Sequence, residues 1–155
     1  MSLNIIEQFY QQYFNATLSE QASVAQQALN PDVKWCVAHP VNDLNGPEAT
    51  HTSFLSPLVT AMPDVERRPM IVMNGEFEGR TWYNSTGYFV GTFEQPLFGI
   101  PATGKTLYLR YTEMVCVEND QIIESYMIPD FIDAMNQSRV NPVSYTHLRA
   151  HETTV

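Results

Sequence analysis

Four strand-like runs follow one another in the second half of the chain, and they constrain its fold more than any other feature of the sequence. They are rich in β-branched and aromatic residues and lie at about residues 65–76, 80–93, 105–118 and 121–128. The segments before them have helical spacing, so the order predicts an α+β fold with N-terminal helices on one face of an antiparallel sheet. Long strands of this kind bend around the helices, and the hollow between the two layers is where a ligand is expected.

Three helices are predicted in the first half of the chain and one at the end of the native part. The expected ranges are about 3–17, 20–29, 47–62 and 130–137, with a short buried strand at 33–38. Ser19 is expected to cap the second helix, and Asn30-Pro31 to end it. Pro57 is expected to kink or divide the third helix, because proline lacks a backbone N–H. We therefore predict one domain without internal repeats.

Charge and composition exclude several kinds of partner. The 155 residues suffice for one domain with one core, and a formal net charge of −9 argues against nucleic acid or an anionic membrane surface. No apolar run approaches the roughly 20 residues of a membrane-spanning helix, and the N-terminus lacks the pattern of a secretory signal. Cys36 and Cys116 are expected to be buried free thiols, although a disulfide stays open from sequence alone. The reducing cytoplasm is therefore the expected location.

The segment GIPATGKT, Gly99–Thr106, matches the spacing of a nucleotide-binding P-loop. A P-loop needs a helix directly after it, with its backbone N–H groups directed at the phosphates. The residues that follow, Thr106–Glu118, instead alternate like a strand and contain no helix cap. Pro101 also removes one of the backbone N–H groups that a phosphate would use. We interpret this segment as a loop between two strands, and Lys105 as a solvated charge or a residue near the mouth of a pocket.

The last residues of the chain are interpreted as a tail that is not native. With one choice of codons, Val143–Thr153 back-translates into a common sequencing adapter, so the hypothesis assigns residues 1–140 to the domain and 141–155 to the tail. His147 and His151 stand four residues apart, as in some zinc sites, but they fall in this tail. Without them, two histidines and two separate cysteines remain. No metal site with three protein ligands is expected from this inventory.

Four segments of the chain carry a family resemblance. They are HPVNDLNGPEA (His39–Ala49), MPD (Met62–Asp64), FGIPATGK (Phe98–Lys105) and ENDQIIESYMIPD (Glu118–Asp130). In this order and spacing they resemble the SnoaL-like polyketide cyclases, members of the nuclear-transport-factor-2-like superfamily. The resemblance implies a cone of curved antiparallel sheet wrapped around N-terminal helices, with an internal pocket and often a homodimer. The founding members close a polyketide ring by intramolecular aldol chemistry without metal or organic cofactor, so none is expected here.

Two residues are expected to carry the acid–base chemistry that the resemblance implies. The family places a catalytic acid at the aspartate that ends the last strand, here Asp130, and keeps a histidine at the end of the first strand, here His39. A carboxyl group in an apolar pocket can remove a proton next to a carbonyl and later return it. Asp130 at the start of a helix can equally be an N-cap, and His39 a hydrogen-bonded histidine at a strand end. His51 is expected to be exposed.

One position departs from the family pattern. Where the family often has Gly-Thr-His-x-Gly in its third strand, this chain has Phe89 in place of the histidine. A missing donor to the substrate carbonyl weakens the case for cyclase activity proper. The residues expected to line the substrate site are Tyr83, Phe89, Arg110, Tyr126 and Trp35. Two hypotheses follow: a cofactor-independent enzyme acting on a small hydrophobic carbonyl compound, or a non-catalytic small-molecule-binding or dimerisation module of the same fold.

Overall fold

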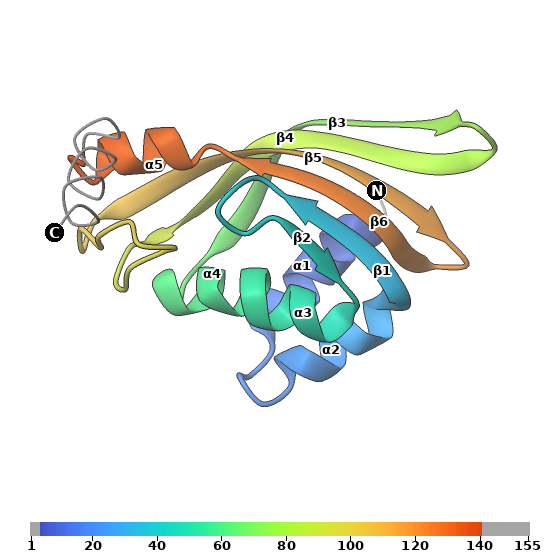
Figure 1. Cartoon of the computed structure of the whole chain (residues 1–155), viewed down its shortest axis with the longest axis horizontal. Coiled ribbons are helices and arrows are strands. Elements are labelled where there is room, and N and C mark those ends of the chain that lie inside the picture. The colour runs from blue at the N-terminus through green and yellow to red at the C-terminus, as the bar shows by residue number, and fades with distance from the viewer. Residues whose placement is uncertain (1–3, 141–155) are drawn as a thin grey trace, which may run out of the picture.

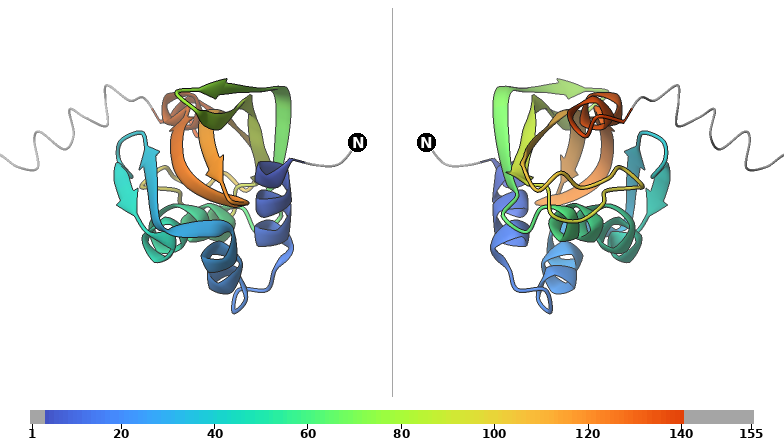
Figure 2. Two further views of the ribbon diagram at one scale, coloured as in Figure 1. Left: turned by 90° about the vertical axis from the view of Figure 1, so that its right-hand side faces the viewer. Right: turned by 90° about the vertical axis from the view of Figure 1, so that its left-hand side faces the viewer.

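A curved sheet covers a group of helices in the computed structural model, which describes residues 4–140 (Figure 1). The helices are α1 (Ile5–Asn15), α2 (Gln21–Ala28), α3 (Pro47–Thr50), α4 (Ser56–Ala61) and α5 (Phe131–Gln137). The strands are β1 (Leu29–Val37), β2 (Asp43–Asn45), β3 (Glu66–Phe77), β4 (Arg80–Thr92), β5 (Thr106–Glu118) and β6 (Gln121–Pro129). Helices α1 to α4 lie on the concave face of the sheet, whereas α5 continues from its end (Figures 1 and 2). The α+β architecture predicted from the sequence is confirmed.

The strands of the described residues form one six-stranded sheet in the order β2-β1-β6-β5-β4-β3. Strands β3 to β6 are antiparallel neighbours, as expected for consecutive hairpins, whereas β1 runs parallel to β6. This parallel pair joins the first and last strands of the chain, so it brings the end of β1 beside the end of β6. The pairing of Val37 with Met127 sets this register.

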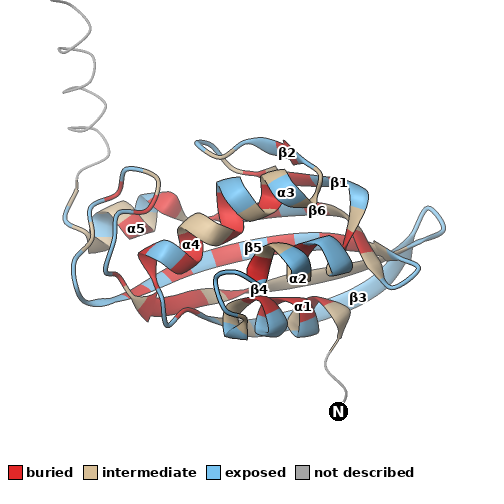
Figure 3. Ribbon diagram, turned by 90° about the horizontal axis from the view of Figure 1, so that it is seen from below, coloured by how far each residue is buried: buried red, intermediate tan, exposed pale blue. Residues whose placement is uncertain are grey.

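The core lies between the helices and the concave face. Helix α1 turns Ile6, Phe9, Tyr10 and Tyr13 toward the sheet, and all four are buried. Their spacing of three and four residues is that of one helix face, which is why this helix was predictable. Figure 3 shows the same division, with buried segments on the facing sides of α1, α4 and β5. Burial of this largely aromatic face holds α1 to the sheet.

The second helix ends earlier than predicted. Helix α2 stops at Ala28, and Asn30-Pro31 lies inside strand β1, which begins at Leu29. Ser19 does not cap it either: the N-cap position is Glu20, whose carboxylate instead accepts a hydrogen bond of 2.8 Å from the Thr17 hydroxyl. Leu29 is fully buried, so packing against the core extends the strand toward the helix. Proline is tolerated here because β1 pairs with β6 irregularly between Leu29 and Lys34.

The third helical segment passes Pro57 without dividing. A π-helical turn, His51–Leu55, joins α3 to α4, and the Ser56 N–H donates to the His51 carbonyl. The wider turn accommodates the proline, whose missing N–H would interrupt an ordinary α-helix at this point. Helical structure therefore runs from Pro47 to Ala61, close to the predicted range.

The interpretation of the P-loop-like segment as a strand connection is confirmed. Lys105 is followed directly by strand β5, which begins at Thr106, and no helix starts there. The loop is closed by hydrogen bonds from Phe93 N–H to the Lys105 carbonyl and from Gly104 N–H to the Phe93 carbonyl. The Gly104 N–H, which a P-loop would direct at a phosphate, is thus bonded within the connection from β4 to β5.

Strands β3 and β4 approach each other unusually closely at Gly87. A Cβ atom at this position would lie 2.2 Å from the Arg68 carbonyl oxygen. Strand β3 changes register next to this point, between Pro69 and Ile71. The irregularity separates the inner part of β3, which carries the buried Arg67, from the exposed part of the hairpin that projects beyond the helices (Figure 1).

No helix among residues 4–140 is long and apolar enough to cross a membrane.

Candidate functional site

A buried polar cluster occupies the concave face between α1 and the sheet. The Glu113 carboxylate, 1% exposed, accepts hydrogen bonds from the Tyr10 hydroxyl at 2.8 Å and from the Ser125 hydroxyl at 3.3 Å. The Arg67 guanidinium donates to the other oxygen of Glu113 at 2.8 Å, and it also pairs with Glu7. Because each charge has an opposite charge beside it, the group can remain ionised inside the protein.

Two tyrosine rings enclose the guanidinium of this cluster. The Arg67 Cζ lies 4.6 Å from the ring centres of both Tyr10 and Tyr111. Burial by itself would lower the pKa of Arg67. The Glu113 carboxylate and the other negative groups around it have the larger opposite effect, so the pKa of Arg67 lies above its ordinary value. Burial, followed by the charge of Glu113, raises the pKa of Tyr10 well above that of a free tyrosine. Tyr10 is therefore a neutral hydrogen-bond donor at physiological pH.

The interior of the cone is largely filled by side chains. Phe89 lies 4.9 Å from Tyr111 between ring centres and 5.7 Å from Tyr10, and it is fully buried. Beside the polar cluster a hollow of about 10 Å³ is left, lined by Arg67 and Glu113 among others. A groove of about 460 Å³ opens to the outside between α1 and β3, and Tyr10 and Arg67 are among its lining residues.

A second hollow, of about 410 Å³, lies where strands β5 and β6 meet the start of α5. It brings together three polar side chains far apart in the sequence, His39, Arg110 and Asp130, with apolar walls from Ile128 and Ile132. Side chains point alternately to the two faces of the sheet along each strand, and the buried ones point toward the helices. The exposed Arg110 and Ile128 therefore belong to the convex face of the sheet.

Asp130 begins helix α5 as its N-cap. Its side chain accepts a hydrogen bond of 2.9 Å from the Asp133 N–H, and its own N–H donates to the Arg110 carbonyl at 2.8 Å. The Arg110 guanidinium lies 5.6 Å from the Tyr88 ring centre. The hydroxyl of Tyr88, and to a lesser degree the carboxylates of Asp130 and Asp133, raise the pKa of Arg110. The capping geometry thus holds a carboxylate at one end of the hollow, near a permanent positive charge.

The other residues expected at the substrate site lie elsewhere. Phe89 and Trp35 are fully buried in the core, and Trp35 packs against Phe54 at 6.5 Å between ring centres. Tyr83 lines the small hollow beside Arg67 on the concave face. Tyr126 stacks on Trp82 on the convex face, with 6.3 Å between the ring centres. Of the five expected substrate-binding residues, Arg110 is the one that shares a hollow with Asp130 and His39.

His51 is not exposed as predicted. It is half-buried at the start of the π-helical turn, and its Nδ1 lies 2.6 Å from the Tyr13 hydroxyl. Tyr13 comes from α1, and burial raises its pKa above the ordinary value. The polar neighbours of His51 in the sequence suggested exposure, but the packing of α1 against this turn covers one side of the ring.

The Glu113–Arg67 cluster was not predicted from the sequence, although one signal of it was present. In strand β5 the positions that face the core are Leu107, Leu109, Tyr111, Glu113 and Val115. A carboxylate at an apolar position of this alternation indicates a buried charge with a partner. The sequence contains no such signal for Arg67, because two adjacent basic residues, Arg67 and Arg68, are typical of an exposed strand end. Among residues 4–140 no group of three or more metal-ligating side chains occurs.

Comparison with known proteins identifies relatives over most of the chain. The family model described as SnoaL-like polyketide cyclase matches residues 4–138. A solved protein from Jannaschia sp. CCS1, assigned as a SnoaL-like polyketide cyclase, superimposes with a TM-score of 0.69 at 16% identity, covering 89% of this chain and 91% of its own. IdmH from Streptomyces antibioticus, assigned as a polyketide cyclase, superimposes with a TM-score of 0.69 at 16% identity. The match covers 88% of this chain and 97% of IdmH.

A nuclear-transport-factor-2-like protein from Burkholderia thailandensis gives a TM-score of 0.59 at 12% identity, covering 86% of this chain and 95% of its own. No significant match is found among curated proteins. At these identities the solved structures support the fold.

Proposed function

The chain belongs to the SnoaL-like polyketide cyclase family, and from this premise we propose that it is a cofactor-independent enzyme that uses acid–base chemistry on a small hydrophobic carbonyl compound. The single observation that carries the proposal is the hollow that gathers His39, Arg110 and Asp130. A carboxylate, an imidazole and a guanidinium beside apolar walls are the groups that enolate chemistry uses. A volume of about 410 Å³ fits a small organic ligand.

Each polar group has a role that its position supports. Asp130 removes a proton next to the substrate carbonyl, because the cap holds its carboxylate at the edge of the hollow. Arg110 stabilises the oxyanion that develops, since it stays charged at any physiological pH. His39 donates a hydrogen bond to the second carbonyl. In an aldol closure the enolate carbon then attacks the second carbonyl, and the alkoxide formed takes up the proton that Asp130 removed.

Substitution of Asp130 tests the role of the carboxylate. Asn at this position can still cap α5 but cannot exchange a proton, so Asp130→Asn should fold normally and lose catalysis by about 10²–10⁴-fold. Asp133→Asn is the matched control, because Asp133 lies in the same first turn and its carboxylate accepts from Gln137. An uncharged ketone such as 2-tetralone serves as the probe, with deuterium exchange next to its carbonyl followed by NMR.

We expect the wild type and Asp133→Asn to accelerate this exchange equally, and Asp130→Asn to do so far less. Equal rates for wild type and Asp130→Asn would remove Asp130 from the site. No acceleration by the wild type would refute acid–base catalysis on simple ketones and favour the binding-module alternative.

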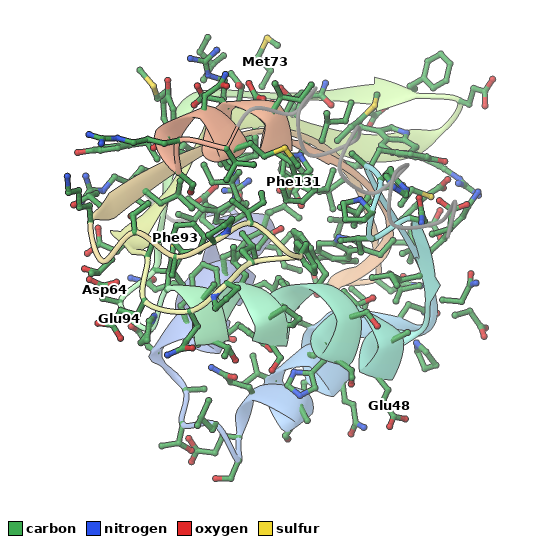
Figure 4. All side chains as sticks on the ribbon, turned by 60° about the vertical axis from the view of Figure 1, so that its left-hand side comes forward. Glu48, Asp64, Met73, Phe93, Glu94 and Phe131 are labelled. Atoms are coloured by element: carbon green, nitrogen blue, oxygen red, sulfur yellow. The ribbon has the colours of Figure 1, made fainter. Side chains whose placement is uncertain are left out.

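The convex face favours a second copy of the chain as partner. It exposes a band of large apolar side chains: Met73, Tyr108, Met114, Tyr126, Ile128 and Ile132, which are 38–65% exposed. Figure 4 shows Met73 directed away from the body of the protein on this side. Exposed apolar surface that runs across neighbouring strands marks an interaction site in most soluble proteins. We infer a homodimer through this face, which would also cover the open side of the hollow at Asp130.

Light scattering during size-exclusion chromatography tests this inference. The wild type should have twice the monomer mass, and Met114→Glu should be a folded monomer because it places a charge in the centre of the band. A wild-type monomer at micromolar concentration would contradict the dimer.

The free thiols of Cys36 and Cys116 support the cytoplasm as the place of action.

A further inference from the structure

We propose that the groove between α1 and β3 is a second binding site, which takes an uncharged apolar molecule whose carbonyl oxygen accepts a hydrogen bond from the Arg67 Nε–H. The groove lies on the other side of the sheet from the hollow at Asp130, and the proposed enzyme activity makes no use of it. The proposed site goes beyond that function, because its ligand is bound by one hydrogen bond and apolar contacts and is not converted.

The groove has the size and lining of a small-molecule site. Its volume is about 460 Å³, within the range that organic ligands occupy. The apolar part of its lining comes from Tyr10 and Phe14 on α1 and from Val65 and Pro69 at the start of β3. An aromatic wall on one side and a proline on the other suit a flat apolar body.

Arg67, one of the residues that line this groove, has a donor without a partner in the described part of the chain. Its side chain is 2% exposed and lines the groove, while its terminal nitrogens pair with Glu7 and Glu113. The third nitrogen, Nε, is buried and has no hydrogen-bond partner among residues 4–140. A buried donor without an acceptor is unfavourable, so a ligand oxygen that reaches it gains a hydrogen bond that the free protein lacks.

The charge balance selects the chemical class of the ligand. Two carboxylates, Glu7 and Glu113, already surround the single positive charge of Arg67. A carboxylate or phosphate ligand would bring a further negative charge into this buried group and be repelled. A ketone, ester or amide oxygen accepts a hydrogen bond without adding charge. The ligand is therefore neutral, with an apolar body.

Glu7 controls how easily the guanidinium is reached. It lies in the first turn of α1, its side chain is 15% exposed, and it lines both the groove and the small hollow beside Glu113. Glu7 pairs with Nη1 of Arg67, so rotation of its carboxylate toward solvent would widen the groove beside the guanidinium. Glu7→Gln removes the charge that holds this side chain on Arg67 and keeps its length. The variant should therefore bind the ligand about three- to tenfold more tightly.

The experiment follows the Nε–H resonance of Arg67 by 15N NMR of the full chain. Arg67→Lys, which lacks this group, identifies the signal. The probes are 4-phenyl-2-butanone, the similarly sized 3-phenylpropanoate, and butylbenzene, which has no oxygen. We expect saturable shifts of this resonance with the ketone, at least tenfold weaker binding of the carboxylate, and no shift with the hydrocarbon.

Two variants separate this site from the proposed active site. Asp130→Asn should leave the ketone-dependent shift of the Arg67 signal unchanged, whereas Phe14→Trp, which fills the groove, should abolish it. An Arg67 resonance that does not respond to the ketone at saturating concentration would overturn the proposal. Binding of the carboxylate as tight as that of the ketone would also overturn it. Neither result depends on whether the chain catalyses exchange at Asp130.

Discussion

Replacement of Glu113 by glutamine removes one charge from the centre of the fold and leaves the shape of the side chain nearly unchanged. In the wild type this carboxylate accepts from Tyr10 and Ser125 and pairs with Arg67, and it is 1% exposed. Breaking a buried ion pair from one side costs about 3–5 kcal/mol, because the remaining charge loses its partner. Here Arg67 keeps Glu7, so we expect Glu113→Gln to lower the free energy of unfolding by about 2–3 kcal/mol.

Urea denaturation followed by tryptophan fluorescence measures this loss. With a denaturant dependence of about 1.5 kcal/mol per molar, a loss of about 2–3 kcal/mol lowers the unfolding midpoint by about 1.3–2 M. Glu118→Gln is the control, because Glu118 is 48% exposed and lies 3.7 Å from Arg80. Such surface pairs contribute about 0–1 kcal/mol, so its midpoint should move by less than about 0.7 M.

The double variant Arg67→Met/Glu113→Leu gives an independent check of the same reasoning. Replacing a buried ion pair by apolar side chains of similar volume is often neutral. The double variant should therefore be more stable than Glu113→Gln alone. A Glu113→Gln midpoint within about 0.3 M of the wild type, with an unchanged denaturant dependence, would show that the ion pair contributes little and would refute the argument.

Three further predictions concern pH, packing and ligands. Burial raises the pKa of Tyr111 to about 12, above the ordinary value of 10.0, so its contribution to stability is complete below pH 10 and is lost as pH rises toward 12. Unfolding midpoints measured between pH 9 and 12 should fall in the wild type and fall less steeply in Tyr111→Phe. Gly87→Ala should lower the stability by about 1–3 kcal/mol or prevent folding, because its Cβ would lie 2.2 Å from a backbone oxygen. Gly75→Ala is the control: it has open space around it and should be close to neutral in thermal melts. Calorimetry should detect no binding of ATP or GTP, since the loop that ends at Lys105 leads into a strand. Tight binding of either nucleotide would contradict the interpretation of this loop as a strand connection.

Local patterns in the sequence determined the secondary structure and much of the architecture. The spacing of Ile6, Phe9, Tyr10 and Tyr13 predicts helix α1, and these residues are buried as that spacing requires. The alternation after Lys105 was enough to reject a nucleotide site, because strand and helix place side chains with different periods. Such signals are local, since each residue's preference depends on its neighbours along the chain.

Element boundaries were less predictable where packing overrides local preference. Asn30-Pro31 was predicted to end the second helix, yet it lies within β1, because the buried Leu29 continues the strand into the core. Pro57 reads as a break, yet the π-helical turn before it lets the helix continue. Both differences arise from contacts with distant residues, which a local pattern does not contain.

The composition of both candidate sites was decided by the tertiary structure. His39 and Asp130 could be named from the sequence through the family resemblance, but they share one hollow because β1 pairs in parallel with β6 and the antiparallel register of β5 adds Arg110. Arg67 meets Glu113 for a similar reason: strand pairing and the packing of α1 place both charges on the concave face. A buried charge is stable only where its partner arrives from another element, and this arrangement exists only in the folded chain.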